Sequence, residues 1–129
     1  MEKLIAALLV LVGLIHILPV SGVLGAERLS ALYGVSIVDP DLAILMRHRA
    51  VLFGLLGVFM IYAAFKPALQ PLALLAGFVS VVSFIVIAWA VGNYNEAVRR
   101  VVIADVVAVI ALCVAGLLYV VICRPGPQV

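Results

Sequence analysis

Charged side chains are scarce in this sequence: they make up 11% of its 129 residues, whereas 68% are hydrophobic. A soluble domain is about half apolar and about one-quarter charged. The shortage of charge, together with a mean hydropathy of +1.42, excludes an ordinary soluble domain and indicates a membrane protein. The net charge is only +2 and no run rich in Lys and Arg occurs, so we expect no nucleic-acid partner.

Cysteine and histidine are also rare, with two residues of each. Cys113 and Cys123 would be separated by roughly 15 Å in one helix, which is too far for a disulfide. The sequence has no Cys-x-x-Cys and no paired-histidine spacing, so we expect neither a thiol redox centre nor a metal or haem site. No Walker loop, dinucleotide fingerprint or nucleophile–base arrangement is present, and motifs therefore identify no catalytic residue and no cofactor.

Long apolar runs dominate the rest of the sequence. A helix needs about 20 apolar residues to cross the hydrocarbon layer of a membrane. Four segments qualify, near residues 4–23, 42–65, 72–91 and 97–123. The first could be read as a signal peptide, but we expect it to be the first transmembrane helix. The sequence therefore predicts one integral membrane domain over residues 1–129, an all-α, four-helix transmembrane bundle.

Turn-forming residues separate these spans. Lys66-Pro67 and Pro71 bracket a short second loop, and residues 92–95 form the third. Short loops make neighbouring helices antiparallel, so both chain ends and the second loop should share one side of the membrane. The first connection, residues 24–41, is longer, and residues 27–33 could form a short interfacial helix within it. We also expect Pro19 to kink the first span.

The distribution of Lys and Arg bears on orientation. The side of the chain ends carries Lys3, Lys66 and Arg124, and the other side carries Arg28, Arg47, Arg49, Arg99 and Arg100. Counting all of them favours the second side as cytoplasmic. However, four of its five arginines lie at helix starts and could point inward. Without those four, the count places the chain ends in the cytoplasm, and we expect this orientation in a bacterial inner membrane.

Polar residues within the spans gather toward the end of the first and third loops. At a rise of 1.5 Å per residue, six of them lie roughly 9–15 Å in from that end: His16, Arg47, His48, Arg49, Ser83 and Asp105. Stripes of mostly small residues at three- and four-residue spacing indicate the inward helix faces. In the second span the stripe consists of Ala50, Gly54, Gly57, Ile61 and Ala64. Five polar residues share a helix face with these stripes and are expected to point inward: His16, Arg47, Ser80, Ser83 and Arg100. Asp105 lies at the edge of the inward face of its helix, about 100° around from Ala104 of the stripe. Arg49 lies away from the inward face, about 200° around from Arg47.

Inward-facing arginines and histidine repel one another unless an anion is present. Asp105 could pair with an arginine between the second and fourth spans. A ligand with a carboxylate, a phosphate or a quinone carbonyl could also accept their hydrogen bonds. For Arg47-His48-Arg49 the alternative is an interfacial anchor, whose long side chains reach the lipid headgroups.

The segment Arg49-x-x-x-x-Gly54-x-x-Gly57, set in four compact spans with a longer first connection, resembles the DoxX-like group of small prokaryotic membrane proteins. The resemblance implies a bacterial inner-membrane bundle. Members of that group are linked to quinone-coupled sulfur oxidation and to partner redox proteins. For this chain it implies a quinone or hydrophobic-ligand site, or a role as an accessory subunit of a membrane redox partner.

These observations lead to one functional hypothesis and two alternatives. We expect a small integral membrane protein that binds an amphipathic ligand, a quinone or a lipid, through His16, Arg47, His48, Ser83, Arg100 and Asp105. Arg47 and Arg100 would bind the polar head, and His16 and Asp105 would orient it. One alternative is a membrane oxidoreductase or isomerase that uses Asp105 or His48 for proton transfer. The other is an accessory subunit or homo-oligomeric scaffold without a catalytic site.

Overall fold

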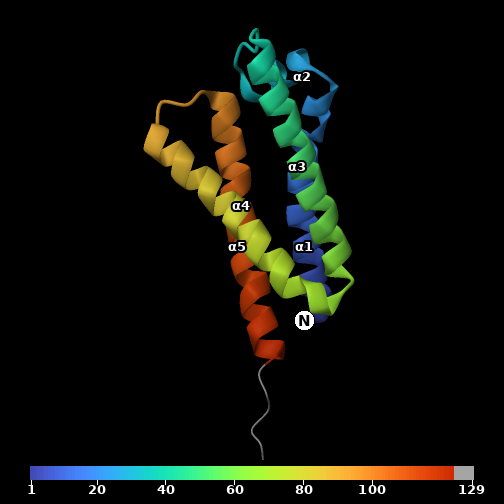
Figure 1. Cartoon of the computed structure of the whole chain (residues 1–129). Coiled ribbons are helices and arrows are strands. Elements are labelled where there is room, and N and C mark those ends of the chain that lie inside the picture. The colour runs from blue at the N-terminus through green and yellow to red at the C-terminus, as the bar shows by residue number, and fades with distance from the viewer. Residues whose placement is uncertain (124–129) are drawn as a thin grey trace, which may run out of the picture.

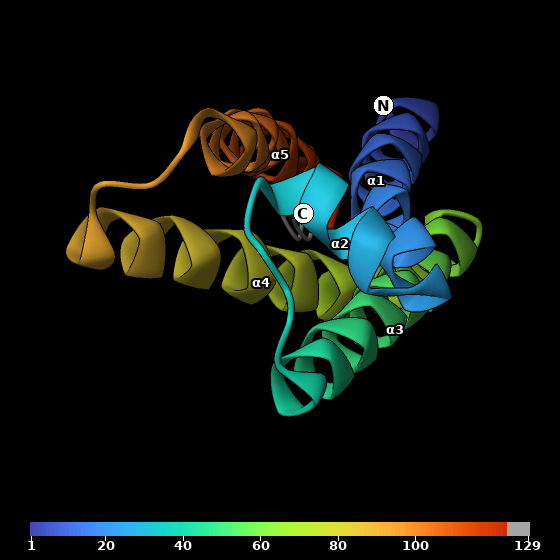
Figure 2. The ribbon, with the colours of Figure 1, turned by 90° about the horizontal axis from the view of Figure 1, so that it is seen from above.

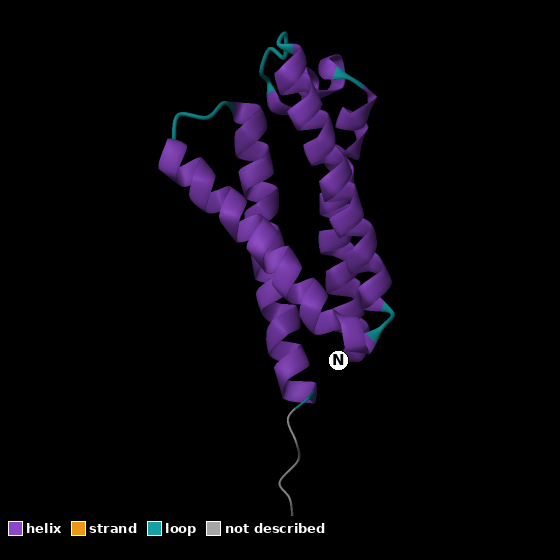
Figure 3. Cartoon of the chain, viewed as in Figure 1, coloured by secondary structure: helices purple, strands orange, loops and turns teal. Residues whose placement is uncertain are grey.

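A computed structural model describes residues 1–123, which form helices joined by short links and contain no strand (Figures 1 and 3). Arg124 and the five residues after it, including part of the predicted domain 1–129, lie outside the described residues. The elements, in chain order, are α1 (Glu2–Ile17), η1 (Leu18–Leu24), α2 (Ala26–Tyr33), α3 (Pro40–Ala64), η2 (Pro67–Leu69), α4 (Gln70–Val91) and α5 (Glu96–Ile122).

Four helical segments are long and apolar enough to cross a membrane: Glu2–Leu24, Pro40–Ala64, Pro67–Val91 and Glu96–Ile122. The predicted all-α bundle of four spans is therefore confirmed, and the chain is a multi-pass membrane protein. The second span begins at Pro40 because the Asp39 side chain accepts a hydrogen bond from the Asp41 amide at 2.8 Å and caps the helix.

The long helices alternate in direction, as predicted from the short loops (Figure 1). The start of α1, the η2 link and the end of α5 lie at one end, and α2 and the α4–α5 loop lie at the other. α1 packs against both α3 and α5, and α4 packs against α5 and α3. α3 and α5 therefore occupy opposite corners, and their backbones do not approach each other closely. Seen from above, α2 lies over the middle of the bundle (Figure 2).

The seam between α1 and α3 is built from glycine. A Cβ atom on Gly57 would lie 2.6 Å from the Gly13 carbonyl oxygen, so the two backbones are in direct contact there. Ala50 and Ala64, on the same predicted stripe, are buried. The small-residue stripe of the second span is thus an interior seam, as predicted, because small residues let membrane helices approach closely.

The first connection turns the chain back over the bundle. At Leu18 the α1 helix gives way to the 3₁₀ turns of η1, with Pro19 near their start, because proline lacks the N–H that would continue the α-helical pattern. The predicted short helix is present as α2. It ends at Gly34, which has φ +63° and donates its N–H to the Ser30 carbonyl oxygen. A positive φ suits glycine, which has no Cβ to clash.

Candidate functional site

A cavity of about 350 Å³ lies at the α2 end of the bundle, within the usual size of small-molecule sites, about 300–1,000 Å³. Its side walls come from α1, η1, α3 and α5, and α2 covers it (Figure 2). The lining residues are Ile15, His16, Leu18, Pro19, Ala31, Leu32, Tyr33, Arg49, Phe53, Ala97, Arg100, Val101, Ala104 and Asp105. The walls are thus mostly apolar, and the ionisable side chains among them are His16, Tyr33, Arg49, Arg100 and Asp105.

His16 is a buried wall of this cavity and ties α1 to α4. Its Nδ1–H donates to the Val12 carbonyl oxygen at 2.8 Å, because a carbonyl can only accept. Its Nε2 lies 3.1 Å from the Ser80 hydroxyl on α4. The imidazole also lies 5.6 Å, centroid to centroid, from the Phe53 ring. Both ring nitrogens are therefore engaged within the protein, which fixes the orientation of the ring toward the cavity.

Arg49 enters the cavity from α3 within a group of aromatic rings. The Nη1 group donates to the Tyr33 hydroxyl at 2.8 Å. The guanidinium carbon lies 4.5 Å from the centre of the Phe53 ring, 5.4 Å from that of Tyr33 and 5.5 Å from that of Phe84. Aromatic faces carry negative charge density that attracts a cation, which compensates for its lost hydration. Arg49 therefore joins α2, α3 and α4 around the cavity.

Asp105 faces the same space from α5. Its side chain is 8% exposed, yet no hydrogen bond or ion pair to its carboxylate is found among residues 1–123. No fully buried side-chain oxygen in the described part of the chain lacks a partner, so the carboxylate oxygens keep their small exposed surface, and that surface faces the cavity. The charge of Arg49 acts on this carboxylate from beyond ion-pairing distance.

Arg100 lines the cavity nearer its outer end. It lies five residues before Asp105 on α5, or roughly 7.5 Å along the helix axis. Its side chain is exposed and makes no hydrogen bond or ion pair within residues 1–123. The guanidinium is thus free to bind a group that enters the cavity.

Three of the six predicted ligand-binding residues meet in this cavity: His16, Arg100 and Asp105. The other three do not line it. Arg47 is exposed and its Nε–H donates to the Val23 carbonyl oxygen at 2.9 Å, which fastens η1 to α3. His48 is exposed. Ser83 is exposed and donates to the Ser80 carbonyl oxygen of its own helix at 3.0 Å. The expected inward position of Arg47 and Ser83 is therefore wrong.

The arginine that belongs to the cavity is Arg49, which the helical phase had placed away from the inner face. The small-residue stripe of α3 faces α1, and Arg47 and Arg49 flank it on opposite sides, each about 80° from Gly57. The cavity, α4 and α5 lie on the Arg49 side. A sequence signal existed in Phe53, four residues after Arg49 and thus on the same face.

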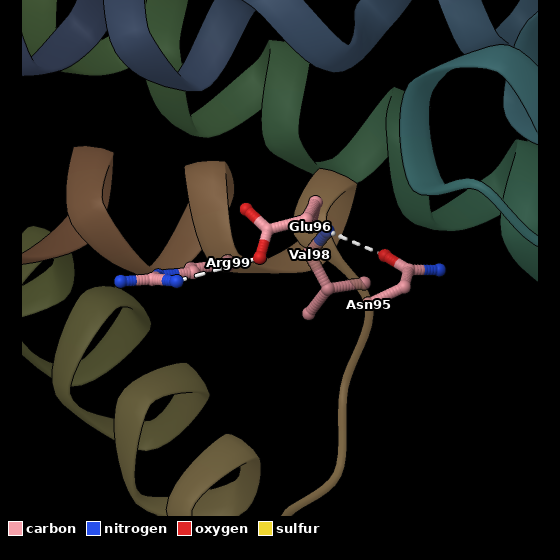
Figure 4. A network of polar contacts seen from close by, with 4 residues as sticks. All are labelled: Asn95, Glu96, Val98 and Arg99. Carbon is pink, nitrogen blue, oxygen red and sulfur yellow. Dashed lines mark hydrogen bonds and ion pairs between the residues drawn. The ribbon is translucent and has the colours of Figure 1, made fainter.

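The start of α5 is held against the end of α2 by Asn95. The Asn95 side-chain oxygen accepts from the Val98 amide at 2.9 Å and caps α5 (Figure 4). Its amide nitrogen donates to the carbonyl oxygens of Tyr33 at 2.8 Å and Gly34 at 3.0 Å. Arg99 and Glu96, also shown in Figure 4, form an exposed ion pair at 3.3 Å, which contributes little to stability. Asn95 is therefore the polar link between α2 and α5, and together with the hydrogen bond from Arg49 to the Tyr33 hydroxyl it keeps α2 over the cavity.

A second hollow lies at the opposite end of the bundle, where the sequence suggested few polar groups. Its volume is about 540 Å³, and its polar lining residues are Glu2, Lys3 and Gln70. The Gln70 side-chain amide donates to the Ala64 carbonyl oxygen, and Glu2 and Lys3 are exposed. This hollow therefore holds no buried ionisable side chain, in contrast to the cavity under α2.

Among residues 1–123, no group of three or more His, Cys, Asp or Glu side chains is arranged to hold a metal ion. No protein-family model, curated protein or solved structure matches this chain. The function is therefore inferred from the chemistry of the cavity itself.

Proposed function

We propose that this protein, in a bacterial inner membrane, binds an amphipathic molecule, a quinone or a lipid, in the cavity under α2. The observation that carries the proposal is Asp105, a buried carboxylate that faces an apolar-walled cavity and has no hydrogen-bond or ion-pair partner within residues 1–123. Ionisable side chains within membrane spans are costly, and they usually mark a functional site. A likeness to the DoxX-like group is part of the same proposal.

The lining divides the roles in binding. Arg100 supplies hydrogen-bond donors to the polar head, and Asp105 supplies an acceptor. Arg49, held by Tyr33 and the aromatic rings, adds positive charge at a fixed place. His16 orients the head through its packed imidazole edge. The apolar part of the ligand lies against Ile15, Leu18, Phe53, Val101 and Ala104.

Removal of the cavity volume tests this proposal. Ala104 lines the cavity, so Ala104→Phe fills it, whereas Ala90→Phe adds the same ring to the exposed side of α4. Protein expressed in bacteria is purified in mild detergent and examined by native mass spectrometry. We expect a bound quinone or lipid on the wild type and on Ala90→Phe, and its loss from Ala104→Phe. Equal retention by all three proteins would contradict the proposal.

Arg100→Gln provides a second test that leaves the packing intact, because Arg100 is exposed and unpaired in residues 1–123. We expect it to lower the amount of bound molecule, while Arg47→Gln, outside the cavity lining, leaves that amount unchanged. The same spectra report subunit number, and a homo-oligomer that carries no small molecule would favour the scaffold alternative.

The enzymatic alternative depends on Asp105 and His48 sharing a cavity. His48 is exposed and outside the lining, so nothing in the geometry favours it as a second function. We infer from Lys3 and Lys66 that the chain ends, at the end opposite the cavity, face the cytoplasm, whereas Arg47, Arg99 and Arg100, which are exposed at the cavity end, count toward the other orientation. Labelling of a cysteine at Lys66, in a Cys113→Ala, Cys123→Ala background, from the cytoplasmic side alone tests this orientation.

A further inference from the structure

We propose, on the basis of the function proposed above, that the head of the bound molecule is neutral and bears a hydroxyl or phenol group, which donates to Asp105 and accepts from Arg100. Among the molecules proposed above, this selects hydroxyl-bearing lipids and quinols, the reduced form of quinones, over quinones themselves, whose carbonyl oxygens only accept hydrogen bonds. It rests on the hydrogen-bonding state and the charges of the cavity walls.

The first step is the unmet acceptor. The Asp105 side chain is more than nine-tenths buried and lines the cavity, yet no donor within residues 1–123 reaches its carboxylate. His16 donates to the Val12 carbonyl and the Nη1 group of Arg49 donates to the Tyr33 hydroxyl, and neither side chain makes a hydrogen bond to Asp105 within the described residues. An ionised carboxylate accepts hydrogen bonds and cannot donate them. A ligand that satisfies Asp105 therefore needs an O–H or N–H group.

The second step is the balance of charge. Arg49 and Arg100 line the cavity beside the single carboxylate of Asp105. An ammonium head that approached Asp105 would meet two guanidinium groups of the same sign. A carboxylate or phosphate head would be attracted by the guanidinium groups, but it would repel the carboxylate of Asp105 and offer it no hydrogen-bond donor. A neutral head avoids both repulsions, because like charges in a region of low dielectric constant are strongly unfavourable.

The third step concerns Arg100, which would donate a hydrogen bond to the same head. Arg100 has donors without a partner in residues 1–123, and it lies roughly 7.5 Å along α5 from Asp105. A hydroxyl or phenol oxygen both donates and accepts. Arg100 and Asp105 are also about 140° apart around α5, but both line the cavity, so the head that uses both residues is one that lies in the cavity between their side chains. Methylation of that oxygen keeps the acceptor and removes the donor, which separates the two interactions.

The test uses amphiphiles that share one alkyl chain and one benzene ring: a phenol, its methyl ether, the benzoic acid and the benzylamine. Binding to the purified full chain in mild detergent is measured by thermal shift and by equilibrium dialysis. In the wild type we expect the phenol to bind about tenfold more tightly than the ether, since a hydrogen bond to a charged acceptor is worth at least that factor. The acid and the amine should bind more weakly than the phenol.

Two variants and a control assign this preference to Asp105. Asp105→Ala should abolish the preference for phenol over ether, and Asp105→Asn, which keeps a weaker neutral acceptor, should reduce it. Both remove a charge from an apolar helix, so both should fold. Glu96→Gln neutralises an exposed carboxylate of the same helix outside the cavity lining, and it should leave the preference intact.

The outcomes separate this inference from the function on which it rests. Equal binding of phenol and ether, lost in Ala104→Phe, overturns the hydroxyl preference and leaves the cavity a binding site. Tightest binding of the amine or of the acid overturns it in favour of a cationic or an anionic head. A preference that survives Asp105→Ala overturns the role of Asp105. If no probe binds, or Ala104→Phe binds all of them as the wild type does, the proposed function fails as well.

Discussion

Gly13 of α1 and Gly57 of α3 bring their backbones into contact, so that a Cβ atom on Gly57 would lie 2.6 Å from the Gly13 carbonyl oxygen. A backbone oxygen in the middle of a helix cannot move aside without shifting the helix. The contact therefore sets the distance between α1, which carries His16, and α3, which carries Arg49. The geometry of the cavity depends on this seam.

Substitution of Gly57 by alanine should force α1 and α3 apart. We expect the free energy of unfolding to fall by about 1–3 kcal/mol, the usual cost of overpacking. The measurement is reversible unfolding in mixed detergent micelles, followed by circular dichroism. Gly116→Ala in α5 is the matched control, because a Cβ there meets nothing within 4 Å and alanine favours helix by about 1 kcal/mol. Equal effects of the two substitutions would contradict a tight seam.

The hydrogen bond between His16 and Ser80 should appear as an energetic coupling between α1 and α4. A double-mutant cycle with His16→Leu and Ser80→Ala should give about 0.6 kcal/mol, the average for interhelical hydrogen bonds in membrane proteins. Ser83 is the control, since its hydroxyl bonds within its own helix. The cycle of His16→Leu with Ser83→Ala should show no coupling. Coupling of the same size in both cycles would count against the bond.

Much of the fold could be predicted from the sequence because membrane spans depend on composition and length. Four apolar runs and the turns between them were sufficient to predict the number and direction of the long helices. The small-residue stripe correctly predicted the α3 face that meets α1. These features are local, and each can be recognised within one segment.

The arginine of the cavity could not be predicted in the same way. The stripe of small residues identifies the interface of α3 with α1. Arg49 lies in a different interface, which α3 forms with α2 and α4 and which cannot be recognised from the sequence of α3 alone. Its partners Tyr33 and Phe84 lie on those two elements. Extending the stripe led instead to Arg47, which lies on the far flank and bonds to Val23. Residues 27–33 were predicted to form a short helix, but its position over the cavity depends on the contacts of Asn95 and on the hydrogen bond from Arg49 to Tyr33.

The planar shape of Arg49, and not only its charge, should matter. Arg49→Lys keeps the positive charge but loses the fork that reaches Tyr33 and the flat face that stacks on Phe53. We expect the free energy of unfolding to fall by about 1 kcal/mol, measured as for the glycine variants. Arg47→Lys, which affects one exposed hydrogen bond to Val23, should change it by less than about 0.5 kcal/mol. A larger loss of unfolding free energy for Arg47→Lys than for Arg49→Lys would show that the aromatic rings do not hold Arg49.

Asn95 has two roles that one substitution can separate. Asn95→Asp keeps the oxygen that caps α5 at Val98 but replaces the amide that donates to the Tyr33 and Gly34 carbonyls. Two carbonyl acceptors would then face a carboxylate, which repels them. We expect α5 to retain its cap while α2 loosens over the cavity, so that hydrogen–deuterium exchange rises over residues 26–34 and is unchanged at the start of α5.

The control for this prediction is Asn93→Asp, in the same loop. It adds the same charge, and no hydrogen bond of the Asn93 side chain is present in residues 1–123. Exchange over residues 26–34 should then match that of the wild type. Asn95→Ala, which removes the cap as well, should speed exchange in both regions and cost about 1 kcal/mol of stability. If Asn95→Asp leaves α2 as protected as in the wild type, packing and the hydrogen bond from Arg49 to Tyr33 hold the cover of the cavity, and the amide contacts of Asn95 are dispensable.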